Sequence, residues 1–152
     1  MHRTILIPVF AILLGPASAQ TLPQAITDVN AAFGGTVQVK QDRRQQLVFD
    51  LFDASGRFRQ DIVLPNELDT AAIHFSAEED AIIVGCRADK PQCISKEIFK
   101  MNTIRATSRV NLPRPATDPE GKATMATLKV MIAAAAEQLV ATETRERSQR
   151  MK

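Results

Sequence analysis

The chain has 152 residues, of which 45% are hydrophobic and 24% charged, and its formal net charge is +2. This length fits a single domain, and the near balance of charges excludes the strongly basic surface that is typical of nucleic-acid-binding proteins. Because the chain has no tryptophan or tyrosine, stacking on bases is left to seven phenylalanines. We therefore expect no nucleic-acid partner.

The first 19 residues have the features of a secretory signal peptide. A basic start precedes an apolar run over residues 5–14, and the triplet Ala17-Ser18-Ala19 predicts cleavage before Gln20. The same run could be a membrane anchor, but about ten apolar residues interrupted by Pro8 are too few for the roughly 20 that a span needs. No cysteine at the junction could accept a lipid. We expect a free periplasmic or secreted protein without a membrane span.

The only two cysteines flank a turn-forming segment. Cys86 ends the β-rich run 82–86, and Cys93 begins a second run. Strands that leave a short turn stay about 5 Å apart, and an oxidising compartment favours a disulfide between them. The alternatives are two free thiols or half of a metal site. The spacing is not that of a redox pair, and no second cysteine or histidine cluster completes a zinc site. We therefore predict a hairpin over residues 81–99 closed by a Cys86–Cys93 disulfide.

Hydrophobic periodicity predicts seven strands between two helices. Residues 21–33 carry apolar side chains at helical spacing and end at Gly34-Gly35, which is typical of a short amphipathic helix. Alternating patterns then predict an antiparallel meander with a turn over residues 53–56. The predicted strands comprise residues 36–40, 47–52, 58–64, 72–75, 82–86, a run from 93, and 104–110.

A second, longer helix is predicted after the strands. Thr117 and Glu120 have the spacing of a capping box, and Asp118 is an alternative cap. A wide apolar stripe predicts packing on a sheet. Its members are Met125, Leu128, Ile132, Ala135 and Leu139, flanked by Val130, Ala133, Ala136 and Val140. Residues 143–152 have no apolar period and predict a flexible charged tail, so the globular domain is expected to comprise residues 20–142.

Few side chains offer catalytic or metal chemistry. His74 is the only histidine after the signal segment, and strand alternation turns it outward beside no recognisable nucleophile motif. The carboxylates of Asp50, Asp53 and residues 78–80 lack the loop pattern of a calcium site. We therefore expect no catalytic residue, no metal and no cofactor.

One turn suggests anion binding. Lys40, Arg43 and Arg44 lie on and beside the turn between the first two predicted strands. Paired arginines can bind a phosphate or a carboxylate, although charged side chains also occur in turns simply because turns are solvated.

Seven strands followed by a C-terminal helix resemble the order of elements in the pleckstrin-homology-like superfold, over roughly residues 36–141. The resemblance implies an α+β fold in which a seven-stranded, antiparallel, partly open barrel is capped by the C-terminal helix, with the short N-terminal helix as an addition. Phosphoinositide-binding members carry basic residues on the turn that Lys40, Arg43 and Arg44 would occupy. Here Gln45 and Gln46 stand where the basic pattern would continue, and an exported protein would not meet that ligand. A cystatin-like sheet wrapped on the first helix is the competing architecture.

These patterns favour a non-catalytic, exported module that binds a peptide or protein through a strand edge or through the groove beside the last helix. Two alternatives remain open. One is a small hydrolase that uses His74 with an acidic partner, and the other is a secreted inhibitor or effector that acts on one specific enzyme.

Overall fold

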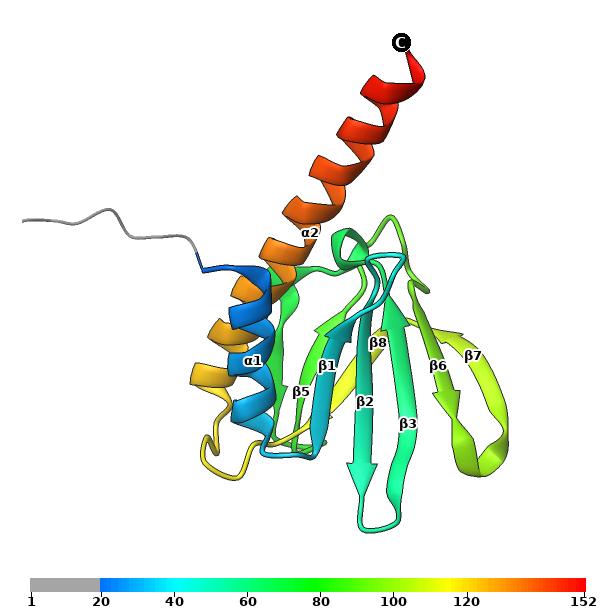
Figure 1. Cartoon of the computed structure of the whole chain (residues 1–152). Helices are drawn as coiled ribbons and strands as arrows, with labels where there is room; N and C mark the ends of the chain where they lie inside the picture. The colour runs from blue at the N-terminus through cyan, green and yellow to red at the C-terminus, as the bar shows by residue number, and fades with distance from the viewer. Residues whose placement is uncertain (1–19) are drawn as a thin grey trace, which may run out of the picture.

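The computed structural model describes residues 20–152 and shows an α+β fold of two helices and two antiparallel sheets (Figure 1). The predicted signal peptide lies outside the described residues. The first sheet has five strands in the order β1 (Val37–Gln41), β2 (Leu47–Asp53), β3 (Gly56–Val63), β6 (Ile94–Ile98) and β7 (Thr103–Thr107). The second sheet has three strands in the order β4 (His74–Ser76), β5 (Ala81–Gly85) and β8 (Arg109–Pro113). Three short 3₁₀ helices lie in the connections between strands. Helices η1 (Pro65–Glu67) and η2 (Thr70–Ala72) lie between β3 and β4, and η3 (Phe99–Met101) lies between β6 and β7.

The β1–β2–β3 meander follows from residue alternation. Val37, Val39, Phe49 and Leu51 are buried on the inner face of the five-stranded sheet, where they pack with the helices. Gly56 closes the β2–β3 turn at φ +105°, a backbone conformation that favours glycine. This part of the fold confirms the expected antiparallel meander.

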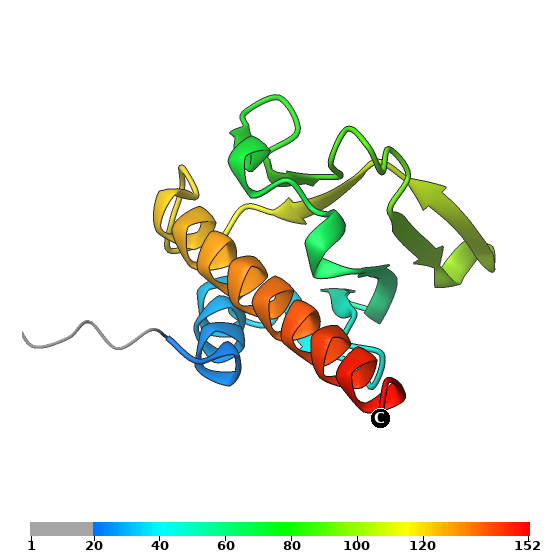
Figure 2. The same cartoon turned by 90° about the horizontal axis from the view of Figure 1, so that it is seen from above.

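Both helices pack on one side of the sheets and against each other. Helix α1 (Leu22–Phe33) buries Ala25, Val29 and Phe33, and ends at Gly34 in the left-handed conformation. Helix α2 (Lys122–Arg150) crosses α1 and extends beyond the body of the domain (Figure 2). Because α1 belongs to the core, it is not the addition to a barrel that the sequence predicted.

The start of α2 differs from the predicted capping box. The segment from Pro115 to Gly121 forms turns, and Gly121 lies at φ +65°, which a right-handed helix cannot include. The helix therefore begins at Lys122. The alternative cap at Asp118 is also wrong, because the N-cap is Gly121 and Pro119 lies before the helix. The carboxylate of Asp118 nevertheless accepts hydrogen bonds of 2.8 Å from both the backbone N–H and the hydroxyl of Thr124 in the first turn.

The C-terminal segment is helical rather than irregular. Helix α2 continues to Arg150, and every residue from 143 to 150 is exposed. By length and composition α2 could also cross a membrane. Its apolar inner face packs inside the protein: Leu128, Met131, Ile132 and Ala135 are fully buried in the core that the sheets and α1 share.

The predicted hairpin over residues 81–99 is wrong, and the described part of the chain has eight strands instead of the seven predicted. Strand β5 already has β4 and β8 as neighbours, and β6 has β3 and β7, so β5 and β6 lie in different sheets. The predicted strand 104–110 breaks at Ser108, and its halves, β7 and β8, also join different sheets. Residues 20–152 therefore form two open sheets and no closed barrel.

Candidate functional site: the sheet junction and the edge of β7

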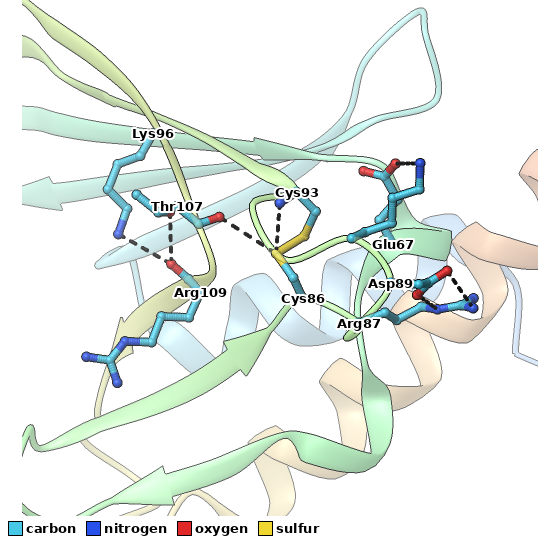
Figure 3. Close-up of a disulfide and its surroundings, with 9 residues drawn as sticks. Glu67, Cys86, Arg87, Asp89, Cys93, Lys96, Thr107 and Arg109 are labelled. Atoms are coloured by element: carbon cyan, nitrogen blue, oxygen red, sulfur yellow. Dashed lines mark hydrogen bonds and ion pairs between the residues drawn. A yellow bond between two sulfur atoms is a disulfide. The ribbon is translucent and has the colours of Figure 1, made fainter.

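A disulfide joins the two sheets (Figure 3). Cys86 directly follows β5 and Cys93 directly precedes β6, with an S–S distance of 2.08 Å and a Cα–Cα distance of 5.8 Å. The pairing predicted from the sequence is confirmed. Its place in the fold differs, because the bond connects strands of separate sheets and does not close a hairpin.

The connection from β7 to β8 also passes between the sheets, and it lies against the connection from β5 to β6. The N–H of Cys86 donates to the carbonyl of Ser108 at 2.9 Å, and the N–H of Cys93 donates to Cys86 Sγ at 3.1 Å. The Thr107 carbonyl oxygen lies 3.7 Å from Cys86 Sγ, a contact without a hydrogen bond because a disulfide sulfur carries no proton. The connection from β5 to β6 and the connection from β7 to β8 are therefore held together at one point.

A hollow of about 430 Å³ opens beside the disulfide, over residues 89–93 and Glu67. Its charges are already paired. Arg87 forms an ion pair with Asp89 at 3.1 Å, and Lys90 lies 3.8 Å from the carboxylate of Glu67. A charged ligand in this hollow would have to compete with these pairs, so we do not place the site here.

Long side chains of the five-stranded sheet hold β8 from across the junction. Arg59 Nη2 donates to the carbonyl of Asn111 at 2.6 Å, and Lys96 Nζ donates to the carbonyl of Arg109 at 3.4 Å. These two carbonyls belong to an edge strand, and the Arg109 carbonyl also accepts from the Thr107 hydroxyl at 3.3 Å. The edge of β8 is therefore closed by side chains instead of by a further strand.

Asp61 lies fully buried beneath these bridging side chains. Arg59 Nη2 lies 3.2 Å from Asp61 Oδ2, and Lys96 is the cross-strand partner of Asp61. Among the described residues, neither carboxylate oxygen of Asp61 has a partner with hydrogen-bond geometry. Burial raises the pKa of Asp61, and the charges of Arg59 and Lys96 only partly oppose this.

Cations outnumber carboxylates around Lys96. Burial lowers the pKa of Lys96, the charge of Asp61 opposes this, and repulsion from Arg59, Arg105 and Arg109 adds to the lowering. Arg109 has a partner of its own, the carboxylate of Glu79 at 2.8 Å. Arg105 forms no ion pair within residues 20–152. The inner face of β7 therefore carries an unneutralised positive charge.

Of the four sheet edges in the described part of the chain, three are closed or short. On β1, the side-chain amide of Asn30 donates to the Val39 carbonyl at 3.0 Å and accepts from the Val39 N–H at 2.6 Å. Strand β8 is held by Arg59 and Lys96, and β4 has only three residues. These are recognised ways in which proteins protect strand edges from pairing with other chains.

The remaining edge, that of β7, is open. The strand is the last of the five-stranded sheet, and with β6 it forms a ribbon on the side of the molecule opposite the helices (Figure 1). Ile104 is 69% exposed and the preceding Met101 is 60% exposed. An exposed strand edge with apolar side chains is the feature of this structure that most favours binding of another chain.

The predicted anion site is only partly available. Lys40 Nζ lies 2.7 Å from Asp50 Oδ2, so this lysine is neutralised on the outer face of the sheet. Arg43 and Arg44 are exposed in the turn between β1 and β2, and their role in anion binding stays a prediction. Asp50 also accepts hydrogen bonds from Gln60 at 2.6 Å and Arg57 at 3.2 Å, which identifies it as a structural carboxylate.

Replacing Asp50 with Asn should lower the free energy of unfolding by about 1–3 kcal/mol at pH 7, because the carboxylate accepts three hydrogen bonds, two of them from cations. Burial opposes ionisation of Asp50, but the hydrogen bonds from Lys40 and Gln60 and the two positive charges together lower its pKa below 3.8. A carboxyl with a lowered folded-state pKa stabilises the fold above the unfolded-state value, and this contribution is lost as the pH falls through the folded-state value. Urea unfolding at pH 7 and pH 3 should therefore show the deficit shrinking in acid.

Asp89→Asn is a suitable control, because that carboxylate forms an exposed ion pair and its loss should leave stability unchanged. An equal deficit for Asp50→Asn at both pH values would contradict the role assigned to Asp50.

The remaining candidates show no concentrated chemistry. His74 lies on β4 with Ile73 buried and its own ring exposed, as alternation predicted, and its Nδ1 donates to the Ala72 carbonyl at 3.0 Å. Glu79 and Asp80 pair with Arg109 and Arg114. No three metal-binding side chains gather anywhere in residues 20–152.

Comparisons with protein-family models, curated proteins and solved structures found no match for this chain. The site is therefore described by its geometry alone. Sequence reasoning passed over Arg59, Asp61, Lys96 and Arg105, although these charged residues alternate along their strands on what became the inner face. That pattern of charges at core-facing positions was the available signal.

Proposed function

We propose that this chain is an exported, non-catalytic module that binds an extended peptide segment as an additional strand on the open edge of β7. The observation that carries the proposal is the contrast between edges: β1, β8 and β4 are closed or short, whereas the five-residue strand β7 has no strand on its outer side and carries the exposed side chain of Ile104. Strand addition uses such an edge, with main-chain hydrogen bonds for affinity and alternate side chains for selectivity.

Export follows from the signal peptide that residues 1–19 predict, and the disulfide is compatible with it. We place the module in the periplasm or outside the cell. The proposed likeness to the pleckstrin-homology-like superfold concerns only the order of elements and supports no part of the binding mode.

The groove beside the last helix is a weaker location. The outer face of α2 is hollowed over Ala133, Ala136 and Val140, but helical main-chain groups are already bonded within the helix. A hydrolase built on His74 has less support still, because the described contact of that ring is a main-chain carbonyl. An inhibitor or effector could use the same β7 edge on an enzyme, and the partner's identity would distinguish it.

The test is selection of random octapeptides displayed on phage against the secreted protein with its disulfide formed. A selected peptide is then synthesised twice more, with N-methyl groups at odd or at even positions. Because alternate N–H groups of a strand face its neighbour, one methylation pattern should abolish binding and the other should leave it intact. Signals of Ile104 should shift in the NMR spectrum of the complex.

Equal binding by both methylated peptides, or shifts confined to α2, would contradict strand addition at β7. Failure to select any peptide would contradict the proposed function itself.

A further inference from the structure

The two faces of β7 differ in chemistry. Side chains of Thr103, Arg105 and Thr107 point to the inner face with their partners on β6, whereas Ile104 and Ala106 point to the outer face. A strand added beside β7 would alternate in the same way, so its successive side chains would meet two different surfaces.

On the inner face of β7, an added strand would meet positive charge that the described residues do not neutralise. Arg105 lies opposite Lys96, and Arg59 and Arg109 lie on the same inner side, with Asp61 and Glu79 as the neighbouring carboxylates. Asp61 is buried beneath Arg59 and cannot reach Arg105, and Glu79 is bound to Arg109. A carboxylate on the added strand opposite Arg105 would supply the missing counter-charge.

The outer face requires apolar side chains. Ile104 is 69% exposed, and its cross-strand partner on β6 is Glu97. A carboxylate on this face would lie beside the apolar side chain of Ile104, with the charge of Glu97 one strand further on, whereas an aliphatic side chain would cover Ile104. Acidic residues are therefore expected at every second position of the peptide, where the side chains point to the inner face.

We propose, on the basis of the strand-addition function above, that the β7 edge selects an extended segment in which acidic residues alternate with aliphatic ones. The acidic residues face Arg105 and its neighbouring cations, and the aliphatic residues pack on Ile104.

The test uses three capped octapeptides of alternating Val-Glu, Val-Gln and Val-Lys, titrated calorimetrically into the secreted protein. Because each cross-strand charge pair contributes up to about fivefold in affinity, we expect the Val-Glu peptide to bind roughly tenfold more tightly than the Val-Gln peptide. Arg105→Gln should weaken the Val-Glu complex about fivefold, and Arg105→Glu should transfer the preference to Val-Lys. Molar salt should reduce the difference between peptides.

Arg145→Gln is the matched control, because Arg145 is exposed on the projecting part of α2 and should not affect binding. Equal affinity for Val-Glu and Val-Gln, unchanged by Arg105→Gln, would overturn this inference while leaving strand addition in place. If none of the three peptides binds and Arg105→Gln makes the protein self-associate, Arg105 serves to block edge pairing and the inference is also wrong. Loss of strand addition itself would be detected separately by the paired N-methyl peptides.

Discussion

Replacing Cys86 and Cys93 together with serine should lower the free energy of unfolding by about 2.5 kcal/mol, the chain-entropy value for a ring of this length. The bond also holds the connection from β5 to β6 where it meets the connection from β7 to β8, at the junction of the two sheets. Urea unfolding under oxidising conditions measures the change.

Repeating the measurement with added reductant provides the control. Reduction should destabilise the wild-type protein by a similar amount and leave the double variant unchanged. A double variant as stable as the oxidised wild type would show that the sheets are held together without the disulfide.

Arg59→Met should be the most damaging single change, lowering the free energy of unfolding by about 3–5 kcal/mol, because it leaves the buried carboxylate of Asp61 without its ion-pair partner. It also removes the hydrogen bond to the Asn111 carbonyl on β8. Arg57→Met is the matched control, since Arg57 lies two residues away with an exposed side chain, and its ion pair with Asp50 should contribute less than about 1 kcal/mol.

The pH dependence of the Arg59→Met deficit identifies its cause. Burial raises the pKa of Asp61 above 3.8, so the folded state favours the protonated carboxyl, and this preference is lost as the pH rises through the folded-state pKa. The deficit should therefore shrink in acid. The double variant Arg59→Met/Asp61→Leu should be more stable than Arg59→Met alone at pH 7, and strictly additive effects would show that the two side chains do not interact.

The sequence predicted the parts of this fold that depend on local patterns. Alternation predicted the β1–β3 meander, helical spacing predicted both helices, and the count of two cysteines in a chain with a predicted signal peptide predicted the disulfide. The position of the α2 cap was not predicted, since the N-cap is Gly121, although the Asp118 carboxylate does accept a hydrogen bond from Thr124 in the first helical turn.

The sequence could not predict which strands pair. Two β runs joined by a short connection favour a hairpin, yet β5 and β6 each have two other neighbours, and that arrangement depends on contacts between distant segments. No glycine or proline lies near Ser108 to mark the break between β7 and β8. The length of α2 is greater than its apolar stripe predicts, because residues of good helical propensity such as Glu143, Arg145 and Glu146 continue the helix without a buried face.

The candidate site was missed for the same reason. Lys40, Arg43 and Arg44 were singled out because they are adjacent in sequence, whereas Arg59, Lys96 and Arg105 come from three strands and meet only after the sheet forms. The openness of β7 is likewise a property of sheet order, which no local pattern encodes.

Amide hydrogen exchange along β7, followed by NMR with and without saturating Val-Glu peptide, tests the central claim most directly. In the free protein, β7 amides that point away from β6 should exchange as fast as unstructured amides, while the amide of Val39, held by Asn30, is protected. With the peptide bound, those β7 amides should become slow and Val39 should not change. Protection of the outward β7 amides in the free protein, or their continued rapid exchange in the complex, would contradict an open edge that accepts a strand.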